Sequence, residues 1–395
     1  MSPFPSEPIG VLIVDDSPFM RMTIQKILSQ DPNIKVLGTA RDGLEGIEKL
    51  QALRPKVVTM DVEMPVMDGL QALGEIMRWQ PTPVIVLSAV TTQGAEATLK
   101  ALDLGAFDVV AKPSGGAGTD LHALSVDLLD KVKGAANVNM VCLGRKKPLS
   151  YAAAPSPTTK TGSGMSTGSN GVAASLNLQS SRPSGIGERA RTAQVKGASF
   201  PKYPVEIVAI GTSTGGPSAL QAVLPQLPGN FPVPVLVAQH MPAGFTGPLA
   251  NRLNGLCPLT VREGVNGEIL KAGTIYIAPA GKQIQVQRKG SQLILDIGDA
   301  APIRTLYHPS VDVMFLSLAK EVGKGTLGVV MTGMGNDGAA GMKEVKAAGG
   351  FAVAEAEETC VVYGMPRAIV DGGMADRIAP LGEIGRNIVE CVMRR

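Results

Sequence analysis

The chain has 395 residues, of which 44% are hydrophobic and 18% charged, a size and composition typical of two or three globular domains. It holds no apolar run of the ~18–20 residues that a membrane helix needs, and its first residues lack the pattern of a secretion signal, so we expect no membrane insertion. The net charge of +3 comes from residues 134–204, with nine basic side chains against one acidic. Because that excess does not belong to a folded face, we expect no nucleic-acid partner.

The four cysteines show no close metal-type spacing, and they are typical of reduced thiols in a cytoplasmic protein. They are Cys142, Cys257, Cys360 and Cys391. We therefore expect a cytoplasmic location and no catalytic cysteine.

The first predicted domain, residues 1–133, alternates short apolar runs with amphipathic stretches. The predicted strands are 10–15, 34–40, 57–61, 84–88 and 108–111, and the predicted helices are 19–29, 44–53, 70–79, 95–104 and 121–132. Five such βα units predict a parallel sheet covered by helices on both faces.

Residues 134–203 are predicted to be a flexible linker. The stretch 151–196 is rich in Ala, Ser, Thr, Gly and Pro and has no apolar periodicity. Its positive charge favours an extended chain, and loose contact with the acidic first domain or an anionic membrane surface is a weaker alternative.

The second predicted domain, residues 204–395, is again α/β with a mainly parallel sheet. Its predicted strands are 205–211, 233–239, 273–278, 327–331 and 351–354, its predicted helices are 218–224, 246–253, 311–321, 339–348 and 381–392, and a β-hairpin is expected around Lys289-Gly290.

Several polar residues follow strands of the first domain. They are Asp15 and Asp16 after the first strand, Asp61 at the end of the third, Ser88 at the end of the fourth and Lys112 after the fifth. In a doubly wound sheet these positions gather at the carboxyl edge. Three carboxylates repel one another unless a hard cation such as Mg²⁺ joins them, and an Asp beside that cation can accept a phosphoryl group. Lys112 and the Ser88 hydroxyl could then contact the phosphoryl oxygens. Taken singly, each Asp could instead be an ordinary loop-capping residue.

This pattern resembles a known family. The segments VLIVDDS at 11–17, MDVEMPVMDG at 60–69 and AKP at 111–113 resemble the receiver domain of two-component response regulators. The resemblance implies a flavodoxin-like fold and phosphorylation of Asp61 by a partner histidine kinase. It also implies Mg²⁺ bound by Asp15, Asp16 and Asp61 with the backbone carbonyl of Glu63, and switch roles for Ser88 and Lys112.

Ser213 is the candidate nucleophile of the second domain. It follows the apolar run 207–210, and Gly211, Gly215 and Gly216 permit a tight turn before a helix that Pro217 can start. A hydroxyl at such a strand-to-helix turn can attack a substrate, and nearby helix amides can stabilise negative charge.

Two histidines of this domain could serve as its base. His240 directly follows the apolar run 233–238, whereas His308 precedes a helix and could be a cap or a substrate-loop residue. Position at a strand end favours His240. Asp337, in the glycine-rich loop after strand 327–331, is the predicted acid, although alone it would read as the N-cap of helix 339–348. Ser213 would attack a carbonyl, His240 would relay the proton and Asp337 would fix the imidazole tautomer, with amides after Ser213 or in loop 333–335 stabilising the oxyanion.

Residues 211–215 also fit the nucleophile elbow of α/β-hydrolases. Those enzymes place the acid before the histidine in the chain, whereas here His240 precedes Asp337. A dinucleotide site is disfavoured too, since the third position of a G-x-G-x-x-G motif starting at Gly211 would be Ser213.

The motifs STGG at 213–216, QHMP at 239–242 and TGMGNDGA at 332–339 resemble the chemotaxis methylesterase domain. A receiver, a linker and this domain form the layout of chemotaxis response-regulator protein-glutamate methylesterases. The resemblance implies a Rossmann-like domain in which Ser213, His240 and Asp337 form the triad and Thr214 and Met334 line the site. It implies hydrolysis of glutamate methyl esters on chemoreceptors, deamidation of receptor glutamines and control by phosphorylation. We expect a monomer whose esterase chemistry needs no cofactor.

The competing hypothesis is a non-enzymatic output domain in which Ser213 is structural. The sequence has no helix-turn-helix pattern and no folded basic face, which disfavours DNA as the output. Hydrolysis of a methyl-glutamate peptide by residues 204–395 would distinguish the two hypotheses.

Overall fold

The computed structural model describes residues 7–113, 119–138, 140–143 and 199–394. Most of the predicted linker, residues 144–198, therefore lies outside the described residues, and the predicted boundaries at 133 and 203 stay predictions. Within the described part, no helix is long and apolar enough to cross a membrane.

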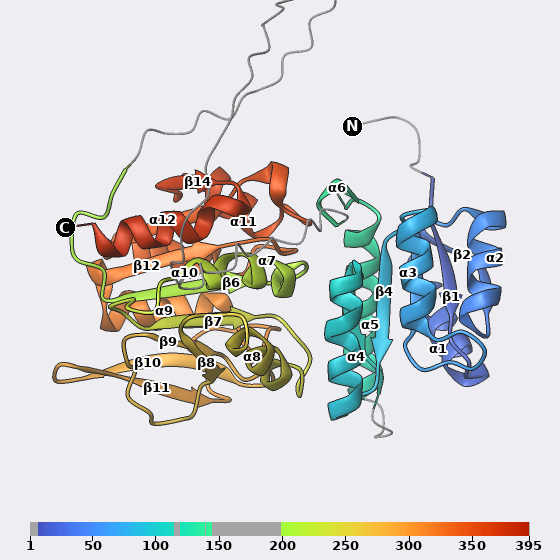
Figure 1. Cartoon of the computed structure of the whole chain (residues 1–395), viewed down its shortest axis with the longest axis horizontal. Coiled ribbons are helices and arrows are strands. Elements are labelled where there is room, and N and C mark those ends of the chain that lie inside the picture. Colours follow the sequence, from blue (N-terminus) through green and yellow to red (C-terminus); the bar gives the residue numbers. More distant parts are fainter. Residues whose placement is uncertain (1–6, 114–118, 139, 144–198, 395) are drawn as a thin grey trace, which may run out of the picture. The chain divides into compact units, whose positions relative to one another are not determined.

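The amino-terminal part is a five-stranded parallel sheet with helices on both faces (Figure 1). Its strands are β1 (Ile9–Val14), β2 (Ile34–Ala40), β3 (Val57–Asp61), β4 (Val84–Ser88) and β5 (Asp108–Ala111). Its helices are α1 (Pro18–Leu28), α2 (Gly43–Leu53), α3 (Gly69–Trp79), α4 (Thr92–Leu104) and α5 (Thr119–Ala135), followed by the short α6 (Met140–Leu143). The strand order β2-β1-β3-β4-β5 is that of flavodoxin-like folds and confirms the predicted class.

The alternation of side chains along β1 explains both layers of this sheet. Val11 and Ile13 pack with α1 and α5, whereas Leu12 and Val14 point to the opposite face, toward α2 and α3. Both faces are covered, so the strand is apolar throughout, as a parallel strand should be.

The carboxyl-terminal part is a seven-stranded parallel sheet in the order β14-β13-β12-β6-β7-β9-β8. Its strands are β6 (Ile207–Thr212), β7 (Val235–Gln239), β8 (Thr260–Glu263), β9 (Thr274–Ile277), β12 (Thr326–Val330), β13 (Phe351–Glu355) and β14 (Arg377–Ala379). Its helices are α7 (Gly216–Val223), α8 (Thr246–Asn254), α9 (Val311–Glu321), α10 (Ala339–Ala347), α11 (Met365–Asp371) and α12 (Leu381–Met393). The predicted hairpin is present as antiparallel β10 (Gln283–Lys289) and β11 (Gln292–Gly298).

Strand β6 lies near the middle of this sheet, between β12 and β7. Val208 and Ile210 pack toward α7 and α12, and Ile207 and Ala209 toward α9 and α10. The helix that follows β6, α7, packs on one face of the sheet, and the helix that follows β12, α10, packs on the other. This is the switch point at which open α/β sheets place their ligands, and residues that follow β12, β6 and β7 must lie close together there.

Candidate functional site

Ser213 lies at the turn between β6 and α7, as predicted. Gly215 adopts φ 79° and is the N-cap of α7, and Pro217 occupies its first turn. A Cβ on Gly216 would lie 2.0 Å from the Gln239 side-chain oxygen, so only glycine fits there. The turn is tight because Gln239, the last residue of β7, packs against it.

Gln239 and Thr332 hold Ser213 in place. The buried Gln239 amide donates to the Ser213 carbonyl at 3.0 Å, and the Ser213 N–H donates to the carbonyl of Thr332, the second residue after β12, at 3.0 Å. Thr332 also donates through its hydroxyl to the Thr214 carbonyl at 3.0 Å. The nucleophile turn is therefore fixed by both neighbouring strands, a feature that the sequence pattern did not reveal.

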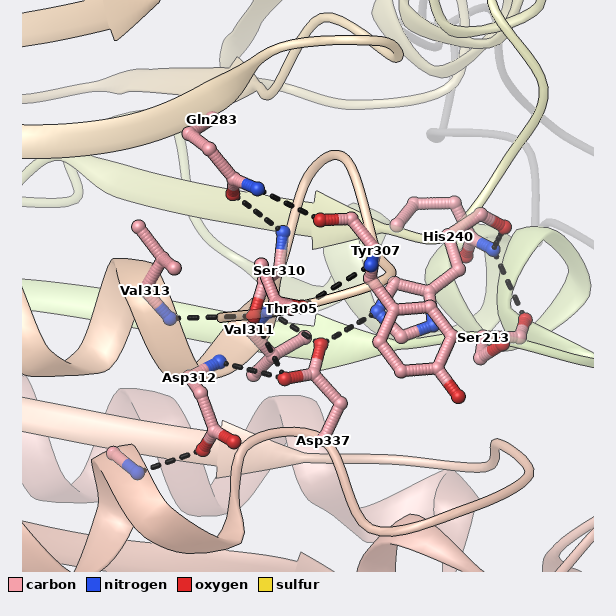
Figure 2. A network of polar contacts seen from close by, with 12 residues as sticks. Ser213, His240, Gln283, Thr305, Tyr307, Ser310, Val311, Asp312, Val313 and Asp337 are labelled. Atoms are coloured by element: carbon pink, nitrogen blue, oxygen red, sulfur yellow. Dashed lines mark hydrogen bonds and ion pairs between the residues drawn. The ribbon is translucent and has the colours of Figure 1, made fainter. Parts of the chain in front are cut away.

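His240 follows β7 and meets Asp337. Its Nε2 lies 2.7 Å from Asp337 Oδ2. Its Nδ1 is buried and has no hydrogen-bond partner among the described residues. Figure 2 shows Ser213 on the side of the imidazole opposite Asp337. No hydrogen bond joins Ser213 to His240 in the described structure, so the structure brings together the base and the acid and leaves the hydroxyl beside them.

Asp337 is buried, and its carboxylate accepts four hydrogen bonds. Besides the His240 ring, its donors are the Ser310 hydroxyl at 2.8 Å and the amides of Val311 and Asp312 at 2.7 and 3.0 Å. The amides belong to the first turn of α9, so the carboxylate lies at the positive end of that helix. Helix α10 has Gly338 as its N-cap with no side-chain cap, so the alternative interpretation of Asp337 as the cap of 339–348 is wrong.

This environment keeps Asp337 ionised. Burial alone would raise its pKa, but the His240 ring and the α9 amides outweigh burial and hold the pKa of Asp337 below its ordinary value. An ionised carboxylate can only accept hydrogen bonds, so His240 Nε2 carries the proton between them. The neutral imidazole then has Nδ1 free to accept a proton.

The other candidates of this domain are Thr214, Met334 and His308. Thr214 follows Ser213 in the same turn, and Met334 follows Gly333, on which a Cβ would lie 2.9 Å from the Ser213 Cβ. His308, the alternative base, is exposed. The amides of Gly216 and Gly333 already donate to the carbonyls of Ser213 and Val362, which removes these two as oxyanion donors.

The predicted acidic cluster is also present at the carboxyl edge of the first sheet. Asp15, Asp16 and Asp61 each offer an oxygen within 4.8 Å of the others. The Lys112 ammonium lies 3.0 Å from Asp15 Oδ2 and 2.6 Å from Asp61 Oδ2. The Ser88 hydroxyl donates to the Gly94 carbonyl at 3.0 Å, and the Glu63 amide lies 3.4 Å from Asp61 Oδ1.

Burial controls the electrostatics of this cluster. It raises the pKa of Asp61, a rise that Lys112 opposes and Asp15 reinforces. For Lys112, burial alone would lower the pKa, but Asp61 and Asp15 outweigh it and the pKa is raised. Three hard oxygen donors at one point, two of them on buried side chains, fit a cation such as Mg²⁺.

Comparison with known proteins finds relatives of both parts of the chain. The family described as CheB methylesterase matches residues 208–388, and the response regulator receiver domain matches residues 11–123. A protein-glutamate methylesterase/protein-glutamine glutaminase of Desulfitobacterium hafniense (strain Y51) is 71% identical over 393 residues, which are 99% of each chain. One of the same name from Moorella thermoacetica is 44% identical over 420 residues, covering 98% of each. The crystal structure of the Thermotoga maritima CheB methylesterase catalytic domain is 40% identical, covers 48% of this chain and 99% of its own, and has a TM-score of 0.46.

Proposed function

The chain belongs to the CheB methylesterase family with an amino-terminal response regulator receiver domain, and from this we propose that it is a phosphorylation-activated protein-glutamate methylesterase and protein-glutamine glutaminase. Its substrates are glutamate methyl esters and glutamine amides on chemoreceptors. It acts in the cytoplasm as a monomer.

Ser213, His240 and Asp337 carry out the hydrolysis. His240 Nδ1 takes the hydroxyl proton as Ser213 Oγ attacks the ester carbonyl, and the same proton then goes to the departing methoxide, which leaves as methanol. Water then attacks the resulting acyl-serine. His240 takes a proton from the water and returns it to Ser213 Oγ as the acyl–oxygen bond breaks, which releases the glutamate carboxylate. In the glutaminase reaction ammonia is the leaving group.

The oxyanion is stabilised by backbone amides of the two segments beside Ser213. Since the amides of Gly216 and Gly333 are already engaged, we assign this role to those of Thr214, Gly215, Met334 and Gly335. The side chains of Thr214 and Met334 line the substrate site.

The receiver controls this activity through Asp61, which accepts a phosphoryl group from a chemotaxis histidine kinase. Asp15, Asp16 and Asp61, with the Glu63 carbonyl, would hold Mg²⁺, which when bound neutralises charge on the transferring phosphoryl group. Lys112 and Ser88 contact the phosphoryl oxygens once it is attached.

The observation that carries the proposal is the His240–Asp337 pair, 2.7 Å apart and built into the α9 terminus, beside a serine at the next strand end. The test is methanol release from methylated chemoreceptor with acetyl phosphate present. Ser213→Ala should abolish release, while Ser218→Ala, in the following helix α7, should not. Wild-type activity in Ser213→Ala would refute the triad, whereas no methanol release from the wild-type chain would favour a non-enzymatic output domain.

A second arm tests regulation. Asp61→Asn should retain the methanol release seen without acetyl phosphate and lose its stimulation by that phosphodonor. Stimulation that persists in Asp61→Asn would show that Asp61 is not the acceptor.

A further inference from the structure

Tyr307 lies flat against the imidazole of His240. The ring centroids are 4.2 Å apart and the planes differ by 6°, a stacked arrangement visible in Figure 2. Tyr307 belongs to the segment between β11 and α9, far in sequence from His240, and the sequence pattern gave it no role. It covers one face of the ring whose edge carries Nε2 and Nδ1.

The backbone of Tyr307 is tied to the network that holds Asp337. Gln283, which is fully buried, donates from its amide nitrogen to the Tyr307 carbonyl at 2.7 Å and accepts from the Ser310 N–H at 2.9 Å. Ser310 in turn donates to Asp337 at 2.8 Å. The ring that covers His240 and the carboxylate that binds it are therefore fixed to the same buried side chain.

His240 needs this support because a single side-chain hydrogen bond holds its ring in the described structure. Rotation about the Cβ–Cγ bond of histidine is soft, so one bond at Nε2 leaves the plane of the ring poorly fixed. A flat neighbour at stacking distance restricts that rotation, and with it the direction in which Nδ1 points.

The stack also suits the protonated ring. The face of an aromatic ring is its negative pole and attracts cations. Burial raises the pKa of the Tyr307 hydroxyl, and Asp337 adds to the rise, so the phenol stays neutral when the imidazole is charged.

We propose that Tyr307 is a positioning residue of the esterase, which holds the His240 imidazole with Nε2 on Asp337 and Nδ1 toward Ser213. This inference rests on the proposed function, since it assigns Tyr307 to the same reaction. Tyr307 acts through His240 and does not itself exchange a proton with the substrate.

Kinetics of the full chain on methylated chemoreceptor give the first test. Tyr307→Leu, which removes the aromatic face, should lower kcat by about ten- to a hundredfold and change KM by less than about twofold. Tyr307→Phe keeps the face and should stay within about threefold of wild type. The matched control is Leu306→Ala, which removes the neighbouring side chain of the same loop, 83% exposed, and should behave as wild type.

Nitrogen-15 NMR of histidine-labelled full chain gives a readout that is independent of activity. The chain has only three histidines, so His122→Gln and His308→Gln assign the His240 signals. Wild type and Tyr307→Phe should show one tautomer with Nε2 protonated, and Tyr307→Leu should show shifts averaged between ring states.

Wild-type kcat together with unchanged His240 shifts in Tyr307→Leu would overturn the inference. A kcat loss in Tyr307→Phe equal to that in Tyr307→Leu would also overturn it, because the hydroxyl would then be the acting group. If wild type itself releases no methanol, the proposed function fails, and the NMR comparison still decides whether Tyr307 orients the imidazole.

Discussion

Glu355 Oε2 accepts a hydrogen bond from the backbone N–H of Thr332 at 2.8 Å, although the Glu355 side chain is completely buried. The Thr332 carbonyl accepts in turn from the Ser213 N–H and from the Thr212 hydroxyl, each at 3.0 Å. A buried carboxyl at the end of β13 therefore supports, through one residue of the β12 loop, the turn that carries the nucleophile.

Glu355 should make the stability of the enzyme depend on pH near neutrality. Burial raises its pKa from 4.5 to about 7, against the opposing hydrogen bonds of Thr332 and Thr359. The folded state therefore binds the proton more tightly than the unfolded state. Below about pH 4.5 the Glu355 carboxyl does not lower the free energy of unfolding. Its destabilising effect grows as the pH rises toward 7 and is complete above that pH. At full strength the penalty is on the order of 3 kcal/mol.

Glu355→Gln should remove this dependence. We expect its Tm to exceed that of wild type at pH 8 and the difference to shrink as the pH falls to 5.5, in thermal unfolding of the full chain. Glu358→Gln, a change at an exposed residue nearby, serves as the control and should follow wild type. A difference between Glu355→Gln and wild type that is the same at pH 5.5 and pH 8 would contradict the assignment.

The Ser310 hydroxyl should contribute to stability more than to rate. Ser310→Ala deletes one of four hydrogen bonds to the buried Asp337 carboxylate, and bonds to charged groups are worth about 1.5–3 kcal/mol. Asp337 keeps its two backbone donors and His240, so methanol release should fall less than about tenfold. Asp337→Asn changes the tautomer partner of His240 and should lower kcat by about 10⁴.

Ser317→Ala is the matched control for Ser310→Ala. Ser317 lies on α9, the helix that Ser310 caps, and its hydroxyl accepts from the Val286 amide and donates to the Met314 carbonyl, away from Asp337. For Ser317→Ala, urea unfolding should show a loss of about 1 kcal/mol in the free energy of unfolding, and kcat should be unchanged. If Ser310→Ala loses as much activity as Asp337→Asn, then Ser310 has a direct part in catalysis.

The sequence predicted the parts of the fold and site that depend on single segments. Apolar runs placed β1, β3, β6, β7 and β12 to within two residues, and polar residues that follow these runs predicted both the acidic cluster and the His240–Asp337 pair. Strand ends are informative because parallel topology brings them to one edge whatever the packing.

What the sequence did not predict depends on side chains meeting across distant segments. Tyr307 on His240, Gln283 on Ser310 and Glu355 on Thr332 leave no periodic signal, since each is one polar residue in an ordinary stretch. The edge strands β8 and β14 were also missed, because they are four and three residues long and carry arginine. Local sequence rules also offered Asp337 as the cap of α10, whereas its carboxylate accepts from the Asp312 amide in the first turn of α9, 25 residues away in the chain.

Gly216 should be intolerant of any side chain. A Cβ there would lie 2.0 Å from Gln239 Oε1 and 2.5 Å from Thr212 Oγ1, both buried. Gly216→Ala gains up to about 1 kcal/mol of helix propensity, but forcing the turn apart costs about 1–3 kcal/mol and moves Ser213. We expect a lower Tm and a kcat reduced by about a hundredfold.

The control for Gly216→Ala lies in another helix of the same domain. Gly382, in the first turn of α12, has open space around its ideal Cβ, so Gly382→Ala should raise the Tm slightly and leave kcat as it is. Equal kinetics in Gly216→Ala and wild type would show that the Gln239 contact does not position Ser213.

Lys112 should stabilise the folded receiver domain while no cation or phosphoryl group is bound. Lys112→Ala leaves Asp15 and Asp61, exposed by 0% and 5%, without their ammonium partner, and breaking such a buried pair costs about 3–5 kcal/mol. Hydrogen exchange in β1 and β3 of the full chain at pH 7.5 should therefore speed up. Lys100→Ala, at an exposed position of α4, should exchange as wild type.

The same variant should recover when the Asp61 carboxylate is protonated or when a cation is bound beside it. The pKa of Asp61 is already raised by burial, and removing Lys112 raises it further, so the ionised form is penalised above that pKa and the penalty fades as the pH is lowered through it. Protection in β1 and β3 should thus return, after correction for intrinsic exchange rates, on going from pH 7.5 to 5, and also on adding Mg²⁺ at pH 7.5. Loss of protection that neither treatment reverses would mean that Lys112 acts by packing and not by charge.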